Sequence, residues 1–309
     1  MIYIDPIDMT DAGLLAGTNT AEPGPGEVAW VASGTYAVAD RRIRANTHRV
    51  YYCVQPHNGR TAPPELDATF WKDVGPTLRW APFDYYASTV NTSTTGDLNY
   101  VISGRYVNAV WLDGLMGASV SISIKNAVGG SVVLTKTQTL KQGSVGYWDY
   151  AYGKKYFVKR VLFKDLPIYP AAEITITVTA SPDATRSIGT IVRGKKTALM
   201  AGGWGGTQWG AKAVPRTFTY RKTNDDGSLQ IVLRGSAVDL DCNVMMELAA
   251  ADQAVDALTR LMSRPVVWFA TDLKNFRALN TFGFASKPVI SYESGRAEIS
   301  NYIEGVVST

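Results

Sequence analysis

The chain has 309 residues, of which 46% are hydrophobic and 19% charged, a balance typical of globular domains and not of disordered segments. Its 28 glycines, 14 prolines and 11% aromatic residues favour β structure with many turns. The net charge of +4 is small, and Lys and Arg are interspersed with acids, so the sequence predicts no nucleic-acid binding.

The N-terminal sequence MIYIDPIDMTDAG is acidic where a signal peptide would be basic. No apolar run approaches the roughly 18 residues that span a bilayer, so we expect no membrane insertion and assembly in a cytoplasm. Cys53 and Cys242 lie far apart and are expected to be buried thiols. With two histidines, His48 and His57, we expect no metal site, no cofactor and no catalytic residues.

Residues 1–26 end in the Pro- and Gly-rich stretch AEPGPGE, which predicts an extended N-terminal arm. Residues 27–83 contain short strand-like pieces such as EVAWVASGTYAV and HRVYYCV, separated by Gly, Asn and Pro. So short a region has few apolar residues, and its large aromatics must supply most of the buried area. We therefore predict a small aromatic β module.

Residues 84–187 carry longer alternating segments, as in ASVSISIKNA and AEITITVTAS, with turns between them. This spacing predicts an antiparallel β-sandwich, similar in general shape to lectin-like jelly rolls. Residues 188–309 mix elements. RTFTYRKTNDDGSLQIVLRG predicts a hairpin with its turn at 224–227, and apolar residues at helical spacing predict one amphipathic helix before Pro265. Overall we expect a mainly β, multi-domain protein with a C-terminal α+β domain.

Three patterns could carry chemistry. Gly189, Gly194 and Lys195 have the spacing of a phosphate-binding loop, but Lys196 stands where Ser or Thr is required and no helix follows. AGGWGGTQWG is either an exposed aromatic contact or, as we favour, a connection whose tryptophans fill a seam between domains.

Asp239 and Asp241 lie two apart and would share one face of a strand. Such a pair can bind a hard cation or do acid/base work, but a solvated strand edge is the interpretation we favour.

The module resembles small chitinase-type carbohydrate-binding modules over about residues 27–74. The residues that carry this resemblance are Trp30, Tyr36, Asp40, Ile43, Tyr51, Tyr52, Cys53, His57, Pro63, Pro64, Phe70 and Trp71. The family normally has Gly at the position of Ala39 and often a second Trp at that of Phe70.

The resemblance implies sugar binding, because aromatic faces pack against the C–H faces of pyranose rings. The candidate carbohydrate-binding residues are Trp30, Tyr36, Tyr52, Phe70 and Trp71. In so small a unit, at least one of Trp30, Tyr52 and Trp71 is instead expected in the core.

Residues 188–307 resemble the closing part of tailed-bacteriophage tail-tip and baseplate proteins. The resemblance rests on the hairpin sequence, AAADQAVDALTRLM, RPVVWFATDL, FGFASKPVISY and the ending EISNYIEGV. It implies a structural virion protein without catalysis, placed at the tail tip and assembled in the host cytoplasm.

The partners implied are copies of the chain in a ring, other tail proteins and host-surface polysaccharide. The alternatives are an accessory carbohydrate-binding protein that works beside a glycan-degrading enzyme, and a hydrolase that uses Asp239 or Asp241.

Overall fold

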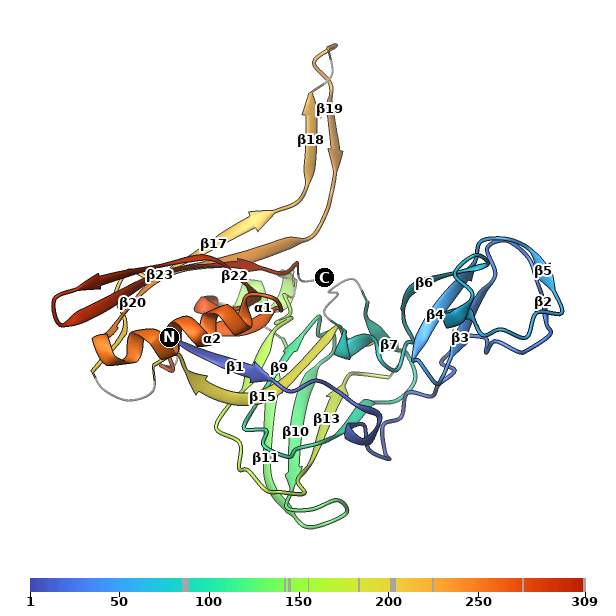
Figure 1. Cartoon of the computed structure of the whole chain (residues 1–309), viewed down its shortest axis with the longest axis horizontal. Coiled ribbons are helices and arrows are strands. Elements are labelled where there is room, and N and C mark those ends of the chain that lie inside the picture. Colours follow the sequence, from blue (N-terminus) through green and yellow to red (C-terminus); the bar gives the residue numbers. More distant parts are fainter. Residues whose placement is uncertain are drawn as a thin grey trace.

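The computed structural model describes residues 1–84, 89–141, 143, 146–154, 156–182, 184–200, 204–223, 225–273 and 275–307. It is mainly β, with several antiparallel sheets, as the sequence predicts. Figure 1 shows a body of packed sheets, the aromatic module at one end and a hairpin that projects from the body. Four short 3-10 helices add turns: η1 (Asp11–Gly13), η2 (Pro64–Leu66), η3 (Ala81–Phe83) and η4 (Arg277–Leu279).

The largest sheet has ten strands and runs through the whole body. Nine strands follow the order β12 (Val161–Phe163), β9 (Ala109–Asp113), β15 (Thr190–Ala198), β1 (Ile2–Pro6), β21 (Val266–Phe269), β22 (Asn280–Glu293), β23 (Arg296–Gly305), β20 (Ser236–Glu247) and β16 (Gly205–Thr207). The tenth, β17 (Lys212–Thr217), also pairs with β20. Because β9 and β12 come from the predicted sandwich region, that region and the C-terminal region share one sheet.

The first residues of the chain form a strand inside this sheet, so the predicted extended arm is wrong for Ile2–Pro6. β1 pairs with β15 on one side and with β21 on the other. Its alternating side chains reach both faces: Tyr3 is 3% exposed in one core cluster and Ile4 is fully buried in another. The uninterrupted apolar run Met-Ile-Tyr-Ile therefore fits a strand that is buried on both faces.

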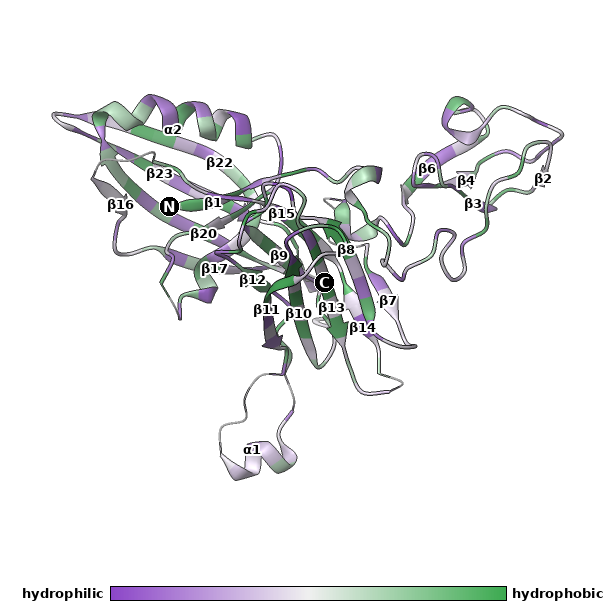
Figure 2. Ribbon diagram, turned by 90° about the horizontal axis from the view of Figure 1, so that it is seen from below, coloured by the Kyte–Doolittle hydropathy of each residue, from purple (hydrophilic) through white to green (hydrophobic). Residues whose placement is uncertain are grey.

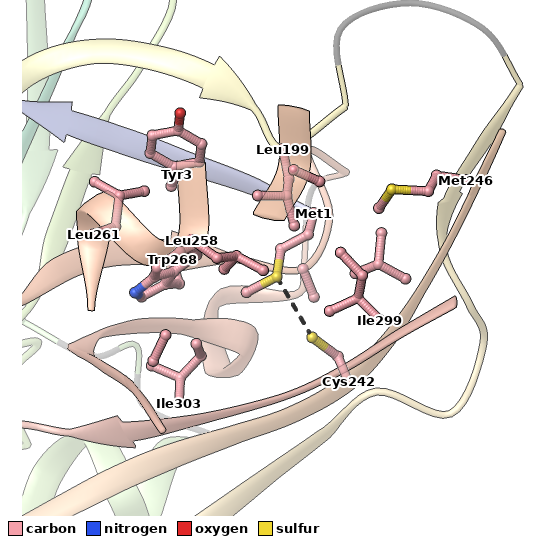
Figure 3. Packing of buried hydrophobic residues seen from close by; sticks show 14 of the residues in the cluster. Met1, Tyr3, Leu199, Cys242, Met246, Leu258, Leu261, Trp268, Ile299 and Ile303 are labelled. Atoms are coloured by element: carbon pink, nitrogen blue, oxygen red, sulfur yellow. Dashed lines mark hydrogen bonds between the residues drawn. The ribbon is translucent and has the colours of Figure 1, made fainter. Parts of the chain in front are cut away.

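The predicted amphipathic helix is confirmed as α2 (Leu248–Leu261), which ends four residues before Pro265. Its buried side chains, Ala250, Ala251, Ala254, Leu258 and Leu261, pack on β20, β22 and β23. Figure 3 shows this core, where Trp268, Ile299 and Met1 meet the helix. Cys242 lies in the same core with its Sγ 3.8 Å from Sδ of Met1, and burial raises the pKa of its thiol to about 11.

A second layer covers the other end of the large sheet, as expected for a sandwich. Its four strands follow the order β11 (Val132–Thr139), β10 (Ser119–Lys125), β13 (Glu173–Thr179) and β8 (Leu98–Ser103). The isoleucines of SISI and TITVT point inward, where they meet Val110, Leu112 and Ile191 of the large sheet. A two-stranded sheet of β7 (Asn91–Ser93) and β14 (Arg186–Ile188) flanks this core.

Glu173 makes the sandwich sensitive to acid. Its carboxylate accepts hydrogen bonds from Nζ of the cross-strand Lys125 at 2.6 Å and from the Gly129 amide at 2.9 Å. The Lys125 hydrogen bond is the main reason that the pKa of Glu173 lies below its ordinary value. The stabilisation is therefore complete above the unfolded-state pKa of about 4.3, and it is lost as the pH falls through the lower folded-state pKa. Thermal unfolding from pH 7 to pH 3 should show a steeper acid loss in the wild type than in Glu173→Gln, and equal slopes would contradict the assignment.

The aromatic module has small sheets of its own. β3 (Arg41–Arg44), β4 (Arg49–Cys53) and β6 (Trp71–Pro76) form one, while β2 (Thr35–Tyr36) and β5 (His57–Asn58) form another. Two further elements project from the body: helix α1 (Tyr147–Tyr152), and the hairpin of β18 (Tyr220–Thr223) and β19 (Leu229–Val232).

Candidate binding and assembly surfaces

Two of the five predicted sugar-binding residues lie in the core of the module. Tyr36 is 5% and Trp71 2% exposed, and they pack with Tyr51 and Cys53. The rings of Tyr36 and Trp71 meet edge to face with centroids 5.0 Å apart. Assigning these two as sugar platforms is therefore wrong, because neither has a free face. The expectation that at least one of Trp30, Tyr52 and Trp71 lies in the core is confirmed by Trp71.

The hydroxyl of Tyr36 is also fully used inside the module. It donates a hydrogen bond to the carbonyl of Val31 at 2.7 Å and accepts one from the Val31 amide at 2.8 Å. A buried tyrosine needs such partners for its polar end. Tyr36 therefore ties the loop before β2 to the core and has a structural role.

Trp30 and Phe70 are half-buried and pack against this core from outside. Each ring is covered by a guanidinium group: that of Arg44 lies 4.9 Å from the Trp30 ring centroid and that of Arg60 lies 3.9 Å from the Phe70 centroid. Arg44 is itself held by two hydrogen bonds to Glu65, at 3.0 and 3.2 Å. A sugar could stack on these covered faces only after displacing an arginine.

Tyr52 lies apart from the other four candidates. It is half-buried on β4, where successive side chains alternate between the two faces of the sheet, so it points away from Tyr51 and Cys53. Its cross-strand neighbours, Arg41 and Lys72, are exposed. The five residues therefore do not form one platform, and Tyr52 neither belongs to the aromatic core nor packs against it.

The predicted hairpin is confirmed and forms a long arm. We call residues 218–223 and 225–234 the hairpin arm. β18 and β19 pair from Tyr220↔Val232 to Thr223↔Leu229. Gly227 adopts the positive φ of 81° that the tight turn requires, while Asn224 lies outside the described residues. The arm exposes six apolar side chains, each between 37% and 83% accessible: Phe218, Tyr220, Leu229, Ile231, Val232 and Leu233.

A buried ion pair fixes the base of the hairpin arm. Asp239 on β20 is 1% exposed, and Arg216 on β17 donates to its Oδ1 at 3.1 Å, while Nε of Arg216 lies 3.1 Å from Oδ2 without hydrogen-bond geometry. Tyr302 donates to Oδ2 at 2.8 Å, which raises the pKa of Tyr302, and the Gly305 amide donates to Oδ1 at 2.8 Å. The favoured solvated edge is therefore wrong for Asp239, although Asp241 is partly exposed.

Residues 204–210 of the AGGWGGTQWG segment lie at the edge of the large sheet, so the predicted buried seam is wrong for both tryptophans, while residues 201–203 lie outside the described residues. β16 pairs with β20 as the last strand, which places the flanking tryptophans outside the body. Trp204 is 50% and Trp209 92% exposed. Trp209 lines an open, mainly apolar pocket of about 370 Å³ with Met1, Ile2, Leu273, Phe276 and Leu279.

The segment with phosphate-loop spacing is part of β15, in the interior of the sheet. Gly194 is required there because a Cβ atom would lie 2.0 Å from the carbonyl oxygen of Asp5 on β1. Lys196 binds the carboxylates of Asp165, at 2.8 Å, and Asp272. Within the described ranges, no three His, Cys, Asp or Glu side chains are grouped as metal ligands.

Sequence reasoning missed the aromatic segment at α1. Tyr147, Trp148, Tyr150 and Tyr152 are each between 72% and 80% exposed. The available signal was the density of Tyr and Trp between Gly146 and Gly153, which has neither strand nor amphipathic periodicity.

Comparison with protein-family models finds no match, and a search of curated proteins finds no similar sequence. In the part of the chain that the structure describes, no helix is both long and apolar enough to cross a bilayer.

Proposed function

We propose that this chain is a structural, non-catalytic protein of a bacteriophage tail tip or baseplate, whose copies associate through the hairpin arm. The observation that carries the proposal is the arm itself. Its strands project from the body (Figure 1), and every described residue of β18 and β19 is exposed, including the apolar ones. Exposed apolar surface of this kind marks an interaction site, which supports a role in assembly.

The physical argument concerns the stability of a free hairpin. A two-stranded ribbon alone is marginally stable in water, and its unpaired edges are open to pairing with another chain. Neither face of the arm is buried: Leu229 and Ile231 are 55% and 51% exposed, and Val232 is 41% exposed. Burial against a partner would stabilise both its edges and its apolar side chains.

A second copy of this chain is the partner that the molecule itself suggests. The pocket beside Trp209 is apolar and open, with Leu273 63% and Phe276 37% exposed. An apolar element and an apolar pocket at different places on one molecule form a heterologous contact, which closes into a ring when the rotation permits. The sequence resemblance to tail-tip proteins supports the virion setting. The proposed role also includes contact with polysaccharide on the host surface.

Sedimentation velocity on the purified full chain tests the assembly. We expect species heavier than the 33.6 kDa monomer in the wild type. Ile231→Lys with Leu233→Lys should return the protein to monomer, because two charges would be desolvated in the contact. Val128→Lys, at a residue 62% exposed in a turn of the sandwich, is the matched control and should assemble normally.

A monomeric wild type, or an arm variant that still assembles, would contradict the arm as the interface. The virion setting is tested separately by mass spectrometry and antibody labelling of gradient-purified particles from the source culture. Copies at the tail tip are the expected result. Absence from particles, with the protein free or bound to glycan, would favour the accessory carbohydrate-binding alternative.

A further inference from the structure

The segment between β11 and β12 carries a group of exposed aromatic side chains that belong to none of the hydrophobic core clusters. Figure 2 shows α1 at the end of a loop that extends away from the body. We call residues 146–154 together with 156–157 the aromatic tip. Its six exposed rings, between 46% and 80% accessible, are Tyr147, Trp148, Tyr150, Tyr152, Tyr156 and Phe157.

The rings of the aromatic tip support one another without hiding their faces. Trp148 and Tyr152 lie one helical turn apart, with centroids at 5.7 Å and planes only 25° from parallel. Tyr147 meets Trp148 edge to face at 5.5 Å. Two nearly parallel rings that remain 73% and 80% exposed form an extended aromatic surface.

The same segment carries the excess positive charge of the chain. Residues 141–160 hold five Lys or Arg and one Asp, a net charge of +4 that equals the +4 of all 309 residues. Arg160 is paired with Asp113, while Lys154 is exposed two residues after α1, and Lys141 and Lys159 are exposed where the segment leaves and rejoins the sandwich. The charge next to the aromatic surface therefore selects an anionic partner.

We infer that the aromatic tip binds an acidic polysaccharide. Sugar rings offer C–H faces to Trp148 and Tyr152, and their hydroxyl groups can pair with the tyrosine hydroxyls. Carboxylate, sulfate or phosphate groups on the chain would meet the lysines. The interior of a lipid bilayer fits less well as the partner, because four tyrosine hydroxyls would lose their hydrogen-bond partners there. The tip contains none of the hairpin arm residues, so this inference does not depend on the proposed assembly.

The test is affinity electrophoresis and calorimetry of the full chain with three acidic polysaccharides: polygalacturonate, a sulfated dextran and a phosphomannan. Neutral dextran is the uncharged comparison, and vesicles with anionic lipid are the competing surface. We expect binding to at least one acidic polymer that weakens as NaCl is raised.

Trp148→Ala with Tyr152→Ala should weaken this binding about tenfold or more, a loss of about 1.4 kcal/mol or more, because both stacking rings are removed. Lys141→Glu with Lys154→Glu should weaken it similarly. Tyr106→Ala, at a ring 58% exposed elsewhere on the sandwich, should leave it unchanged. Circular dichroism should be the same for all variants, because none of the substituted side chains is buried.

Failure to bind any of the three acidic polymers would overturn the inference. So would equal binding of neutral dextran, unchanged affinity in the Trp148 and Tyr152 variant, or binding to vesicles alone. Any of these results can occur with normal assembly through the hairpin arm, so the two proposals can fail separately.

Discussion

Trp71→Ala should unfold the aromatic module while leaving the rest of the protein folded. Replacing a fully buried Trp by Ala costs about 3–5 kcal/mol, and a core in a unit of this size seldom supplies more than that. Trp71 is 2% exposed and contacts Tyr36 and His57 through its ring, so its loss removes the centre of the cluster. The sheets of the body have separate cores and should keep their stability.

Limited proteolysis of the full chain, with cleavage sites mapped by mass spectrometry, measures this effect. The expected result is rapid cleavage within residues 27–83 and an intact remainder. Tyr52→Ala is the matched control, because Tyr52 lies outside the aromatic core, and it should leave proteolysis unchanged. If Trp71→Ala were as resistant as Tyr52→Ala, the module would not depend on this core.

The Tyr52→Ala variant also serves a second measurement. Lower retention of this variant on an insoluble glycan would assign Tyr52 a contact with sugar.

Arg216→Ala should destabilise the base of the hairpin arm by about 3 kcal/mol, the lower end of the range for breaking a buried ion pair. The value is at the lower end because the Arg216 side chain is 39% exposed, whereas that of Asp239 is 1% exposed. Without the arginine, Asp239 keeps the Tyr302 hydroxyl and the Gly305 amide but loses its cationic partner. The buried carboxylate would then be compensated only by these two hydrogen bonds.

Amide hydrogen exchange locates this loss of stability, because it measures the free energy of local opening separately for each part of the chain. Protection should fall in β17, β20 and the end of β23, and stay constant in β10 and β13. Tyr302→Phe removes one hydrogen bond and keeps the ion pair, so its loss should be smaller, about 1.5 kcal/mol, the lower end of the range for a hydrogen bond to a charged group. Equal losses in Arg216→Ala and Tyr302→Phe would show that the ion pair adds nothing beyond a hydrogen bond.

Local patterns in the sequence predicted the elements whose contacts are close in the chain. Apolar residues at helical spacing before Pro265 predicted α2, and the period-two alternation in SISI and TITVT predicted the strands β10 and β13. The Asp-Gly turn located the hairpin arm. In each case the periodicity of side chains decides which face is buried.

Contacts between distant segments could not be predicted in this way. Ile2–Pro6 looked like part of an arm because nothing nearby shows its partners, which are Gly194–Ala198 and Val267–Phe269. The candidate sugar site failed for a related reason. The sequence does not distinguish an aromatic residue that fills a core, such as Trp71, from one that faces solvent, such as Trp209. Only the packing of the whole module distinguishes the two.

The position of β1 between β15 and β21 also sets an order of events during synthesis. A ribosome adds about 5–20 residues per second, so the two partners of Ile2–Pro6 emerge tens of seconds after it does. During that interval the first strand has two open edges and no core. The aromatic module, built from pairings within Thr35–Pro76, can close early, whereas the large sheet is completed only when nearly the whole chain has emerged.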